Sequence, residues 1–404
     1  MNELRISRTD ELQSWIDANS SSEVVWYLKR LSATEAMAGG SESTGLWMPV
    51  EFIQEIIPQS EHVNRQARSV NLALVVDEHS AESDRLPVTI DWQDEARLSG
   101  VSGTGLLNPE HTGALMVFAF RRGTQSDPVP DCHVWICKKD SEEDLLEDRV
   151  GQVDPGEYRI WSFGKPVAAK SPGRTSACWL QPEQIPAEWH QKFPTGQQII
   201  DLAIKSAPPF GHDIDKRILA RRECEFLIFQ SIEEAIELPT IQKGFDNIDE
   251  FVQRAQTILQ RRKSRSGRSL ELHARQIFRE EGLVEDTDFD FQPRVEGGKA
   301  PDYLFPIAAN YDDLSFPTGR LRMLAVKTTC KDRWRQVLNE ADRIETKHLL
   351  TLQEGVSENQ FREMRDANLQ LVVPAPLHRH YPESIRGQLM SLSQFVSEVK
   401  SLSQ

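Results

Sequence analysis

The sequence lacks the long apolar runs, spaced cysteines and phosphate-binding loops that mark several common protein classes. No stretch approaches the ~20 uncharged apolar residues that a membrane span needs, and the N-terminus has no apolar core of a secretory signal. Five cysteines without a repeating spacing argue against a disulfide framework and for a reducing, cytoplasmic setting. Neither a GxxxxGK[ST] loop nor a GxGxxG fingerprint occurs, so we expect no nucleotide cofactor.

The sequence also has no overall excess of positive charge, because its formal net charge is -15. Taken alone, this argues against nucleic acid as a partner. The charge is uneven, however: residues 1–195 hold 18 Lys and Arg against 30 Asp and Glu, whereas residues 196–404 hold 29 against 32. The second half is therefore the better candidate for a surface that meets DNA.

Residues 1–170 contain short, alternating apolar runs separated by turn residues rich in Gly and Ser. Alternation with period two is typical of strands in which one face is buried. This pattern predicts a mainly antiparallel barrel or sandwich, preceded by a helix near residues 9–18. The predicted strands are 72–76, 87–92, 114–120, 132–137 and 158–163.

Residues 171–196 carry several prolines and no clear periodicity, which is typical of a connection between domains. From residue 197 onward, apolar residues recur at spacings of three and four and then give way to alternating strands and helices. We expect a helix that Ser269 caps and Gly282 ends, with an apolar stripe including Leu270 and Phe278. Residues 197–404 are thus predicted to form an α/β domain.

A basic block runs from Arg254 to Arg279 and has eight cationic residues with only Glu271 to oppose them. One interpretation is a solvated helix end and loop. An equally weighted interpretation is a phosphate-contacting surface, because Arg and Lys among Ser and Gly amides suit phosphate oxygens. The second interpretation proposes these residues as DNA contacts: Arg262, Lys263, Arg265 and Arg268.

Three carboxylates and one lysine between residues 271 and 340 form a candidate catalytic set. Asp302 follows a proline at the entry to an apolar strand, Lys327 lies near the end of the next strand, and Glu340 is expected on the following helix. Glu271 belongs to the preceding helix. Carboxylates that converge beside one lysine suit Mg²⁺-dependent phosphodiester hydrolysis, because Mg²⁺ prefers hard oxygen ligands and can activate a water molecule.

Each of these residues also has an ordinary explanation. Glu271 is spaced i,i+4 from Arg275 and would make a common helix pair. Asp302 after a proline would suit a turn, and Glu340 has Arg335 and Arg343 near it. Lys327 is harder to dismiss, because a lysine in an apolar strand needs a carboxylate partner.

A resemblance supports the catalytic interpretation. Residues 250–385 closely resemble the catalytic domain of EcoRII-type restriction endonucleases, and the whole chain resembles that family more weakly. The family implies a PD-(D/E)XK nuclease fold, Mg²⁺ dependence and cleavage of double-stranded DNA at a short site of the CCWGG kind. It also implies an N-terminal pseudobarrel that binds an effector copy of the site and covers the catalytic cleft. The segments that carry the resemblance are KSRSGRSLELHARQIF, KAPDYLFP, LRMLAVKTTCKDRWRQVLNEADRI, KHLLTLQEGVSENQFREM, YLKRLSA, FAFRRG and DCHVWIC.

The resemblance also implies residue roles. Asp302 is the central metal ligand, Lys327 the catalytic lysine, Glu340 the displaced acidic ligand and Glu271 a supporting carboxylate. Ala325 occupies the position two before the lysine, where many nucleases of the class have an acid. A Mg²⁺ site would therefore use Asp302 and Glu340.

The residues that follow the predicted strand of Lys327 include candidate base readers. Arginine can read guanine in a bidentate manner and aspartate can accept from cytosine N4. A salt-bridged first helical turn is the alternative. The candidates are Lys331, Asp332 and Arg333, followed by Arg335 and Gln336. For effector DNA, the family's arms correspond to Tyr27, Lys29, Arg30 and Arg97.

These observations favour an effector-stimulated type II endonuclease that acts as a homodimer, because a palindromic site suits twofold symmetry. One alternative is a DNA-binding regulator that keeps the fold without cleaving. Another is a nuclease for an altered or modified site, because the second effector arm is poor in basic residues.

Overall fold

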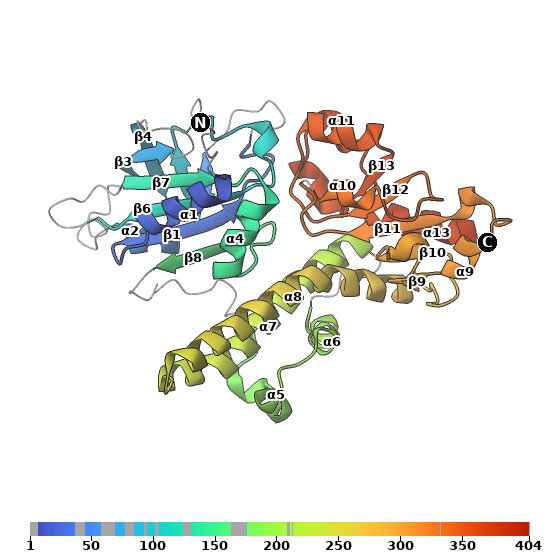
Figure 1. Ribbon diagram of the computed structural model, residues 1–404, viewed down its shortest axis with the longest axis horizontal. Helices are drawn as coiled ribbons and strands as arrows, with labels where there is room; N and C mark the ends of the chain where they lie inside the picture. Colours follow the sequence, from blue (N-terminus) through green and yellow to red (C-terminus); the bar gives the residue numbers. More distant parts are fainter. Residues whose placement is uncertain are drawn as a thin grey trace, which may run out of the picture. The chain divides into compact units, whose positions relative to one another are not determined.

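The computed structural model describes most of the chain, and its residues form two compact units (Figure 1). The first unit comprises Met1–Lys170 with Gln353–Phe361 and His380–Ile385, and the second comprises Ser171–Leu352, Arg362–Arg379 and Arg386–Gln404. The described residues are 7–36, 45–57, 69–76, 85–92, 95–101, 105–123, 131–162, 176–207, 211, 213–331 and 333–403. In these ranges, no helix has the length and apolar character needed to cross a membrane.

The first unit is built on one eight-stranded sheet with the order β2-β5-β4-β3-β7-β6-β1-β8. Neighbouring strands are antiparallel except for the parallel pair β3 and β7. The strands are β1 (Val24–Arg30), β2 (Leu46–Met48), β3 (Ser69–Val76), β4 (Arg85–Trp92), β5 (Ala96–Ser99), β6 (Leu115–Arg121), β7 (Asp131–Ile136) and β8 (Tyr158–Ser162). All five strands predicted from the alternating runs are therefore confirmed, as is the early helix α1 (Arg8–Ala18).

Both faces of this sheet are buried. Strand β1 sends Val25 and Tyr27 into a large core that also receives α2 (Val50–Ile56). It sends Trp26 and Leu28 into a second core beneath α1 and α4 (Asp140–Val150). Because both faces of β1 are buried, its sequence is a continuous apolar run without alternation. The alternating pattern therefore does not predict this strand.

The sheet curls around the larger core. Trp47 of β2 and Tyr158 of β8 belong to opposite edge strands, yet their ring centroids are 5.8 Å apart. The Tyr27 hydroxyl also donates to the Trp47 carbonyl oxygen at 3.2 Å. Within the described residues no ladder joins β2 to β8, so the sheet approaches a barrel through side chains without closing by backbone hydrogen bonds.

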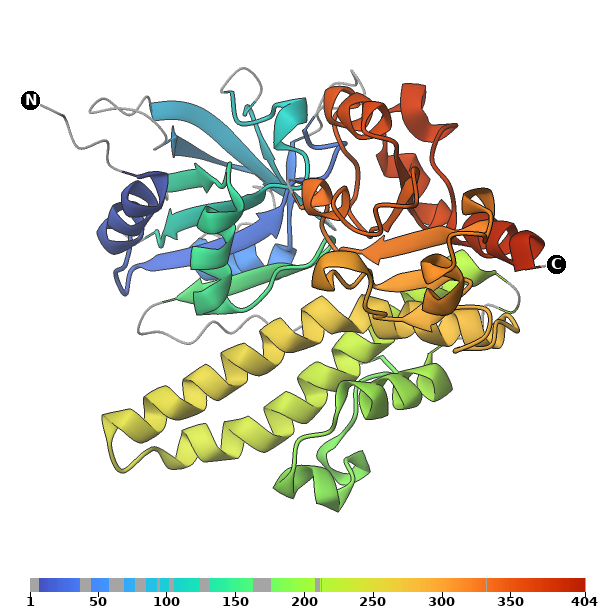
Figure 2. The ribbon, with the colours of Figure 1, turned by 45° about the vertical axis from the view of Figure 1, so that its right-hand side comes forward.

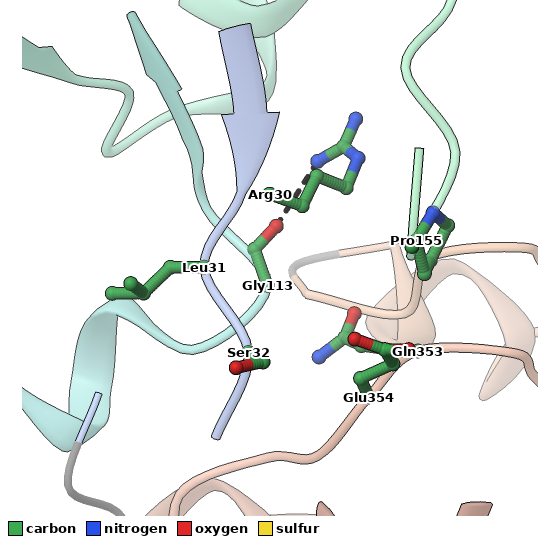
Figure 3. A pocket seen from close by; sticks show the side chains of 8 residues that line it. Arg30, Leu31, Ser32, Gly113, Pro155, Gln353 and Glu354 are labelled. Atoms are coloured by element: carbon green, nitrogen blue, oxygen red, sulfur yellow. Dashed lines mark hydrogen bonds between the residues drawn. The ribbon is translucent and has the colours of Figure 1, made fainter. Parts of the chain in front are cut away.

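A small pocket in the first unit lies where segment 353–361 meets the end of β1 (Figure 3). Its volume of about 10 Å³ has room for a single water molecule. Gly113, at φ +80°, is required there because a Cβ atom would come within 2.7 Å of the Gln353 side chain. The pocket is thus a packing feature and not a ligand site.

The second unit begins with a helical layer. Two long helices, α7 (Ile214–Lys243) and α8 (Ile248–Glu280), form an antiparallel hairpin (Figure 2). The described part of the predicted connection, residues 176–196, includes α5 (Ala187–Gln191) and packs against α7, as does the following helix α6 (Gly196–Ser206). A disulfide links Cys178 to Cys224, although the cysteine spacing argues against a disulfide framework. The other three cysteines are buried and lie outside this disulfide.

The α/β part of the second unit contains a five-stranded sheet with the order β13-β12-β11-β10-β9. Strands β9 (Asp290–Phe291), β10 (Tyr303–Phe305) and β11 (Arg322–Val326) are antiparallel, whereas β11, β12 (Lys347–Leu350) and β13 (Leu369–Val372) are parallel. The second half of α8 and helix α13 (Leu392–Ser403) pack on this sheet around Phe278 and Phe395. The predicted apolar stripe with Leu270 and Phe278, and the helix end before Gly282, are confirmed.

Two helix predictions need correction. Ser269 does not cap a new helix, because α8 runs unbroken from residue 248 to 280 and is capped by Asn247. The helix expected after the catalytic strand is only one turn, α10 (Trp334–Val337). Glu340 lies in the turn beyond it, before Ala341 at φ 47°.

Candidate active site

The four predicted catalytic residues lie at the ends of adjacent elements. Asp302 immediately precedes β10, and Lys327 immediately follows β11, its antiparallel neighbour. Glu271 comes from α8, which packs on the sheet, and Glu340 comes from the turn after α10. The order of the sheet therefore brings together residues that are up to 69 positions apart in the sequence.

Asp302 is fixed by two contacts. Its Oδ2 atom accepts a hydrogen bond from the Val326 backbone N–H at 2.7 Å and lies 3.6 Å from Lys327 Nζ. Burial raises the pKa of Asp302, while Lys327 and the Val326 amide oppose that rise. These contacts exclude the ordinary turn interpretation, because the carboxylate serves the neighbouring strand and its lysine.

Gln292 connects the Glu271 side chain to the backbone of Asp302. The Gln292 side-chain amide donates to Glu271 Oε2 at 2.9 Å, and its backbone N–H donates to the Asp302 carbonyl oxygen at 2.9 Å. Burial, together with the negative charge of Asp302, raises the pKa of Glu271 to about 7. The expected pair with Arg275 is absent, because Arg275 binds Glu285 instead.

Glu340 is the third carboxylate of the cluster. Burial and the charge of Asp302 raise the pKa of Glu340 to about 7, while Lys327 and Lys347 oppose the rise. Its Oε2 atom is buried and has no hydrogen-bond partner. Arg335, one of its expected ordinary partners, binds Glu363, and Arg343 donates to the carbonyl oxygens of Asp313 and Phe316.

The donor set fits a hard cation. A buried carboxylate oxygen without a partner is costly, and the mutual repulsion of Asp302, Glu271 and Glu340 would be relieved by a positive ion. No group of three or more His, Cys, Asp or Glu side chains within the described ranges is arranged to hold a metal. Mg²⁺ tolerates such a site, because it commonly takes one or two carboxylates and keeps water and phosphate oxygens for the rest.

The candidate base readers lie just before α10 and within it. Lys331 is buried, and Asp332 lies outside the described residues. Arg333 is half-buried, whereas Arg335 and Gln336 are exposed. Arg335 lies over the Trp334 ring at 4.5 Å and binds Glu363 at 2.7 Å, so this turn contains part of the salt-bridged arrangement that was the alternative.

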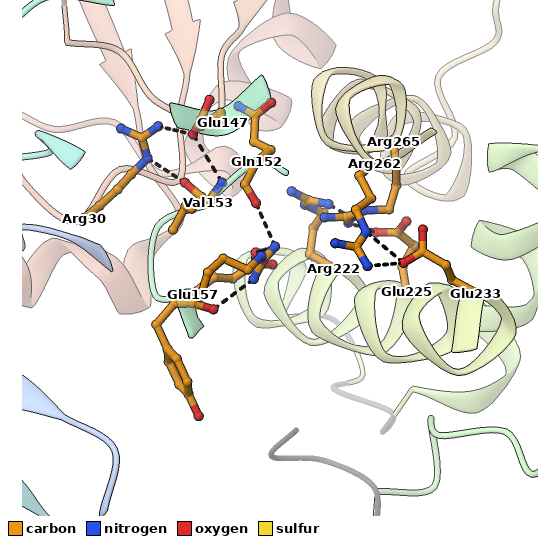
Figure 4. Close-up of polar contacts among 12 residues, drawn as sticks. Arg30, Glu147, Gln152, Val153, Glu157, Arg222, Glu225, Glu233, Arg262 and Arg265 are labelled. Atoms are coloured by element: carbon orange, nitrogen blue, oxygen red, sulfur yellow. Dashed lines mark hydrogen bonds and ion pairs between the residues drawn. The ribbon is translucent and has the colours of Figure 1, made fainter. Parts of the chain in front are cut away.

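Four of the eight cations of the basic block bind glutamates of α7, as Figure 4 shows for Arg262 and Arg265. Arg262 binds Glu233 and Arg265 binds Glu225. Arg265 also packs against the rings of Phe226 and Phe229, so its guanidinium is held within the hairpin, and its contact with a DNA phosphate stays a prediction. Lys263 and Arg268 are exposed, and the block is continuous helix instead of the helix end and loop of the first interpretation.

Three of the four predicted effector residues are buried in the first unit. The Tyr27 side chain is fully buried in the larger core of the first unit. Lys29 binds buried Glu35, and buried Arg30 binds Glu143 and Glu147; Figure 4 shows the contact with Glu147. A buried cation that already has its carboxylates does not reach a phosphate. Arg97 of β5 is exposed and pairs with Glu95.

Comparisons with known proteins agree on one family. The chain matches the family described as EcoRII C terminal over residues 229–396 and that described as restriction endonuclease EcoRII, N-terminal, over residues 20–165. The type II restriction enzyme EcoRII of Escherichia coli is 40% identical over 384 residues, which cover 93% of this chain and 94% of that enzyme.

Two solved structures show weaker similarity. Metal-depleted Ecl18kI in complex with uncleaved, modified DNA has a TM-score of 0.44 and 18% identity, over 55% of this chain and 85% of that chain. The UbaLAI restriction endonuclease B3 domain with cognate DNA has a TM-score of 0.27 and 16% identity, over 37% of this chain and 98% of that chain. Fold similarity at this level adds no argument, but sequence identity along nearly the whole length does: the chain belongs to the EcoRII family of type II restriction endonucleases.

Proposed function

We propose that this chain cleaves both strands of DNA at a short palindromic site and that Asp302, Lys327, Glu340 and Glu271 form its catalytic centre. The observation that carries the assignment is the convergence of these groups at the ends of β10 and β11. Lys327 lies 3.6 Å from Asp302, and burial together with Asp302 raises the pKa of each of the two glutamates to about 7. Such clusters of perturbed carboxylates are typical of functional sites.

In this proposal, Asp302 and Glu340 hold Mg²⁺. When bound, the ion polarises the scissile phosphate and lowers the pKa of an attacking water molecule. Lys327 offsets the negative charge that develops on the phosphorane oxygens and orients the water. Glu271, held by Gln292, supports the arrangement from α8.

We assign the second unit to the PD-(D/E)XK class. Its sheet combines an antiparallel part with a parallel part, and Asp302 and Lys327 occupy the motif positions beside β10 and β11. Ala325 stands where an acid is common in the class, and Glu340 reaches the same cluster from another element. The curled first unit corresponds to the family's pseudobarrel domain.

For recognition, we propose a CCWGG-like site. Arg333 and Arg335 lie a few residues beyond the catalytic strand, and an arginine that reaches the major groove can read guanine O6 and N7. Gln336 is exposed beside them. A palindromic site implies a homodimer, and an effector copy of the DNA would bind the first unit, with Arg97 as a contact. An enzyme with this substrate would act in the cytoplasm.

The test is cleavage of a plasmid that carries one CCWGG site, with Mg²⁺ and with EDTA, followed by sequencing of the ends. The wild-type protein should cut only with Mg²⁺. Asp302→Asn should lose cleavage by several orders of magnitude while keeping DNA binding, because phosphate contacts lie elsewhere.

Asp313→Asn is the matched control, because Asp313 is an exposed aspartate of the same unit that caps only its own loop. It should cut like the wild type. If Asp302→Asn cuts normally, the active-site assignment is wrong. If the wild type binds the site and leaves it intact with Mg²⁺, the chain is a non-cleaving regulator.

A further inference from the structure

The carboxylate of Glu340 is presented by a turn with an unusual backbone. We call residues 340–344 the Glu340 turn, and it lies between the short helix α10 and strand β12. Ala341 has φ 47°, in the left-handed region that residues with a side chain rarely adopt. Such a residue keeps this conformation only where its surroundings hold it there. The contacts of the turn therefore decide where Glu340 lies.

Lys347 binds the carbonyl oxygens of the turn. It is the first residue of β12, and it is only 5% exposed. Its Nζ atom donates to the Ala341 carbonyl oxygen at 2.7 Å and also to the Ile344 carbonyl oxygen. The Ile344 N–H donates to the same Ala341 oxygen at 2.9 Å. One ammonium group thus ties the two ends of residues 341–344 together.

Two other residues bind N–H groups of the turn. The Asp342 N–H donates to Glu296 Oε1 at 2.6 Å, and the Arg343 N–H donates to the Tyr311 hydroxyl at 3.1 Å. Glu296 and Tyr311 accept hydrogen bonds here, whereas the carbonyl oxygens of the turn need a donor. Neither residue can therefore replace Lys347.

The surroundings of Lys347 are unusual for a buried lysine. Such a lysine normally binds a carboxylate, because burial of an unpaired charge is costly. Here both hydrogen bonds of the ammonium go to carbonyl oxygens. Burial lowers the pKa of Lys347, while the negative charges of Asp342, Glu296 and Glu340 oppose that change. The ammonium lies among these acids, but its hydrogen bonds fix it to the backbone of the turn.

The position of Glu340 depends on that backbone. The Glu340 Oε2 atom is buried and has no hydrogen-bond partner. Its carboxylate is nevertheless close enough to Asp302 and Lys327 for both charges to act on its pKa. Catalytic groups need to be placed to within about 0.5 Å of their productive geometry. Because no hydrogen bond fixes Oε2, the backbone of the turn provides this placement.

We propose that Lys347 is a positioning residue for cleavage, whose ammonium holds the turn that brings Glu340 to Asp302 and Lys327. This inference rests on the proposed nuclease function, in which Glu340 is a metal ligand. Lys347 does not touch the DNA or the metal in this arrangement. It acts through Glu340.

Amide hydrogen exchange of the full chain in EDTA tests the contact without metal or DNA. Lys347→Met keeps a long, flexible side chain but removes its donors. Peptides that cover residues 341–346 should exchange at least about tenfold faster than in the wild type, because the turn opens more often. Peptides from β11 and β13 should be unchanged, which checks the fold. If they also exchange faster, the milder Lys347→Gln takes the place of this variant in both measurements.

A double-mutant cycle of cleavage is the second measurement. With saturating DNA and Mg²⁺, Lys347→Met should lower the single-turnover rate by about 10–100-fold and leave the affinity for DNA unchanged. Because Lys347 acts through Glu340, adding Lys347→Met to Glu340→Gln should cause no further loss. A residue that only stabilises the fold would add its own loss to that of Glu340→Gln.

Lys400→Met is the matched control, because Lys400 is a lysine of the same unit that pairs with Glu281. It should behave like the wild type in both measurements. Wild-type exchange in the turn of the Lys347 variant, or losses that multiply in the double variant, would overturn the proposal. A wild type that leaves the DNA intact would instead refute the nuclease itself, and the exchange data would still decide whether Lys347 holds the turn.

Discussion

At the scale of single residues, Glu340 links ionisation to stability. Its pKa is about 7 in the folded chain against an ordinary value of 4.5, because burial and Asp302 disfavour its charge. Between these two values the folded state holds more protons than the unfolded state. The free energy of unfolding therefore falls as pH rises through this window, and the loss is complete above the folded pKa.

The prediction is that Glu340→Gln stabilises the chain at pH 8 in EDTA. The neutral amide avoids the cost of a buried charge, and the gain should be about 1–2 kcal/mol once solvent screening of this partly exposed group is included. Urea unfolding at pH 8 and pH 5 measures the change, which should shrink at the lower pH. Exposed Glu183→Gln is the control and should show no such pH-dependent difference. A Glu340→Gln gain that is equal at both pH values would contradict the ionisation account.

Arg30 gives a residue-scale prediction for the first unit. Its guanidinium binds Glu143 and Glu147, each at 2.7 Å, and donates to the carbonyl oxygens of Gly113 and Val153. Arg30→Met leaves two buried carboxylates without their cation and should cost about 3–5 kcal/mol. Urea unfolding of the first unit measures this loss.

Arg97→Met is the control for Arg30→Met. Arg97 is 41% exposed and pairs with an exposed glutamate, so its replacement should change stability by less than about 0.5 kcal/mol. Equal stability of the two variants would mean that the buried cluster does not fix β1 to α4.

At the scale of elements, local periodicity predicted most strands and the helix end before Gly282, but not where α8 begins. Between residues 262 and 270, the Ser and Gly residues favour a break in the helix and a new cap at Ser269, because Ser and Gly are weak helix formers. Pairing with glutamates of α7 keeps this segment helical, and those partners lie 29 to 44 residues earlier. Tertiary contacts of this kind are invisible to a local pattern.

In the proposed site, too, some residues are indicated by the local sequence and others only by tertiary contacts. The proximity of Asp302 and Lys327 could be predicted, because each borders an apolar strand and matches the family's motif segments, and the structure places them 3.6 Å apart. Gln292 was missed, because no local signal connects it to Glu271, 21 residues earlier. Its left-handed backbone, at φ 52°, is unusual for a residue with a side chain and is visible only in the structure.

The Cys178–Cys224 disulfide gives a prediction at the element scale. It ties the segment before α5 to α7 and closes a loop of 46 residues. The double variant Cys178→Ala with Cys224→Ala should lose about 2–4 kcal/mol, because the unfolded chain regains the freedom that the closed loop removed. Thermal unfolding with and without reductant measures the loss. Reductant should destabilise the wild type and leave the double variant unchanged; an unchanged wild type would show that the bond does not stabilise the second unit.

At the scale of the whole molecule, the two units differ in charge and in chemistry. Residues 1–195 carry 18 basic against 30 acidic residues, while the proposed catalytic centre and the basic block of α8 belong to the second unit. An acidic domain on a tether competes with DNA for a basic surface, and the tether raises its effective concentration. The first unit should therefore restrain cleavage until effector DNA occupies it, in line with the autoinhibition that the family resemblance implies.

Deletion of the first unit tests this restraint. The core of the second unit determines the residue at which the truncated chain should begin. A chain that starts at residue 196 lacks Cys178, Leu180 and Trp189, which belong to the core against α7. A chain that starts at residue 171 keeps them. Both pieces retain Asp302, Lys327, Glu340 and Glu271, so both should cleave. The 171–404 piece should be the more stable, because it keeps that apolar core and the disulfide.

The measurement is the single-turnover cleavage rate of 171–404, 196–404 and the full chain on a plasmid with one site. The 171–404 piece should cut faster than the full chain, because no acidic domain competes with the DNA. Adding effector oligonucleotide should accelerate the full chain and leave the truncated one unchanged. If 171–404 is folded and dimeric yet slower than the full chain, the first unit assists cleavage and does not restrain it.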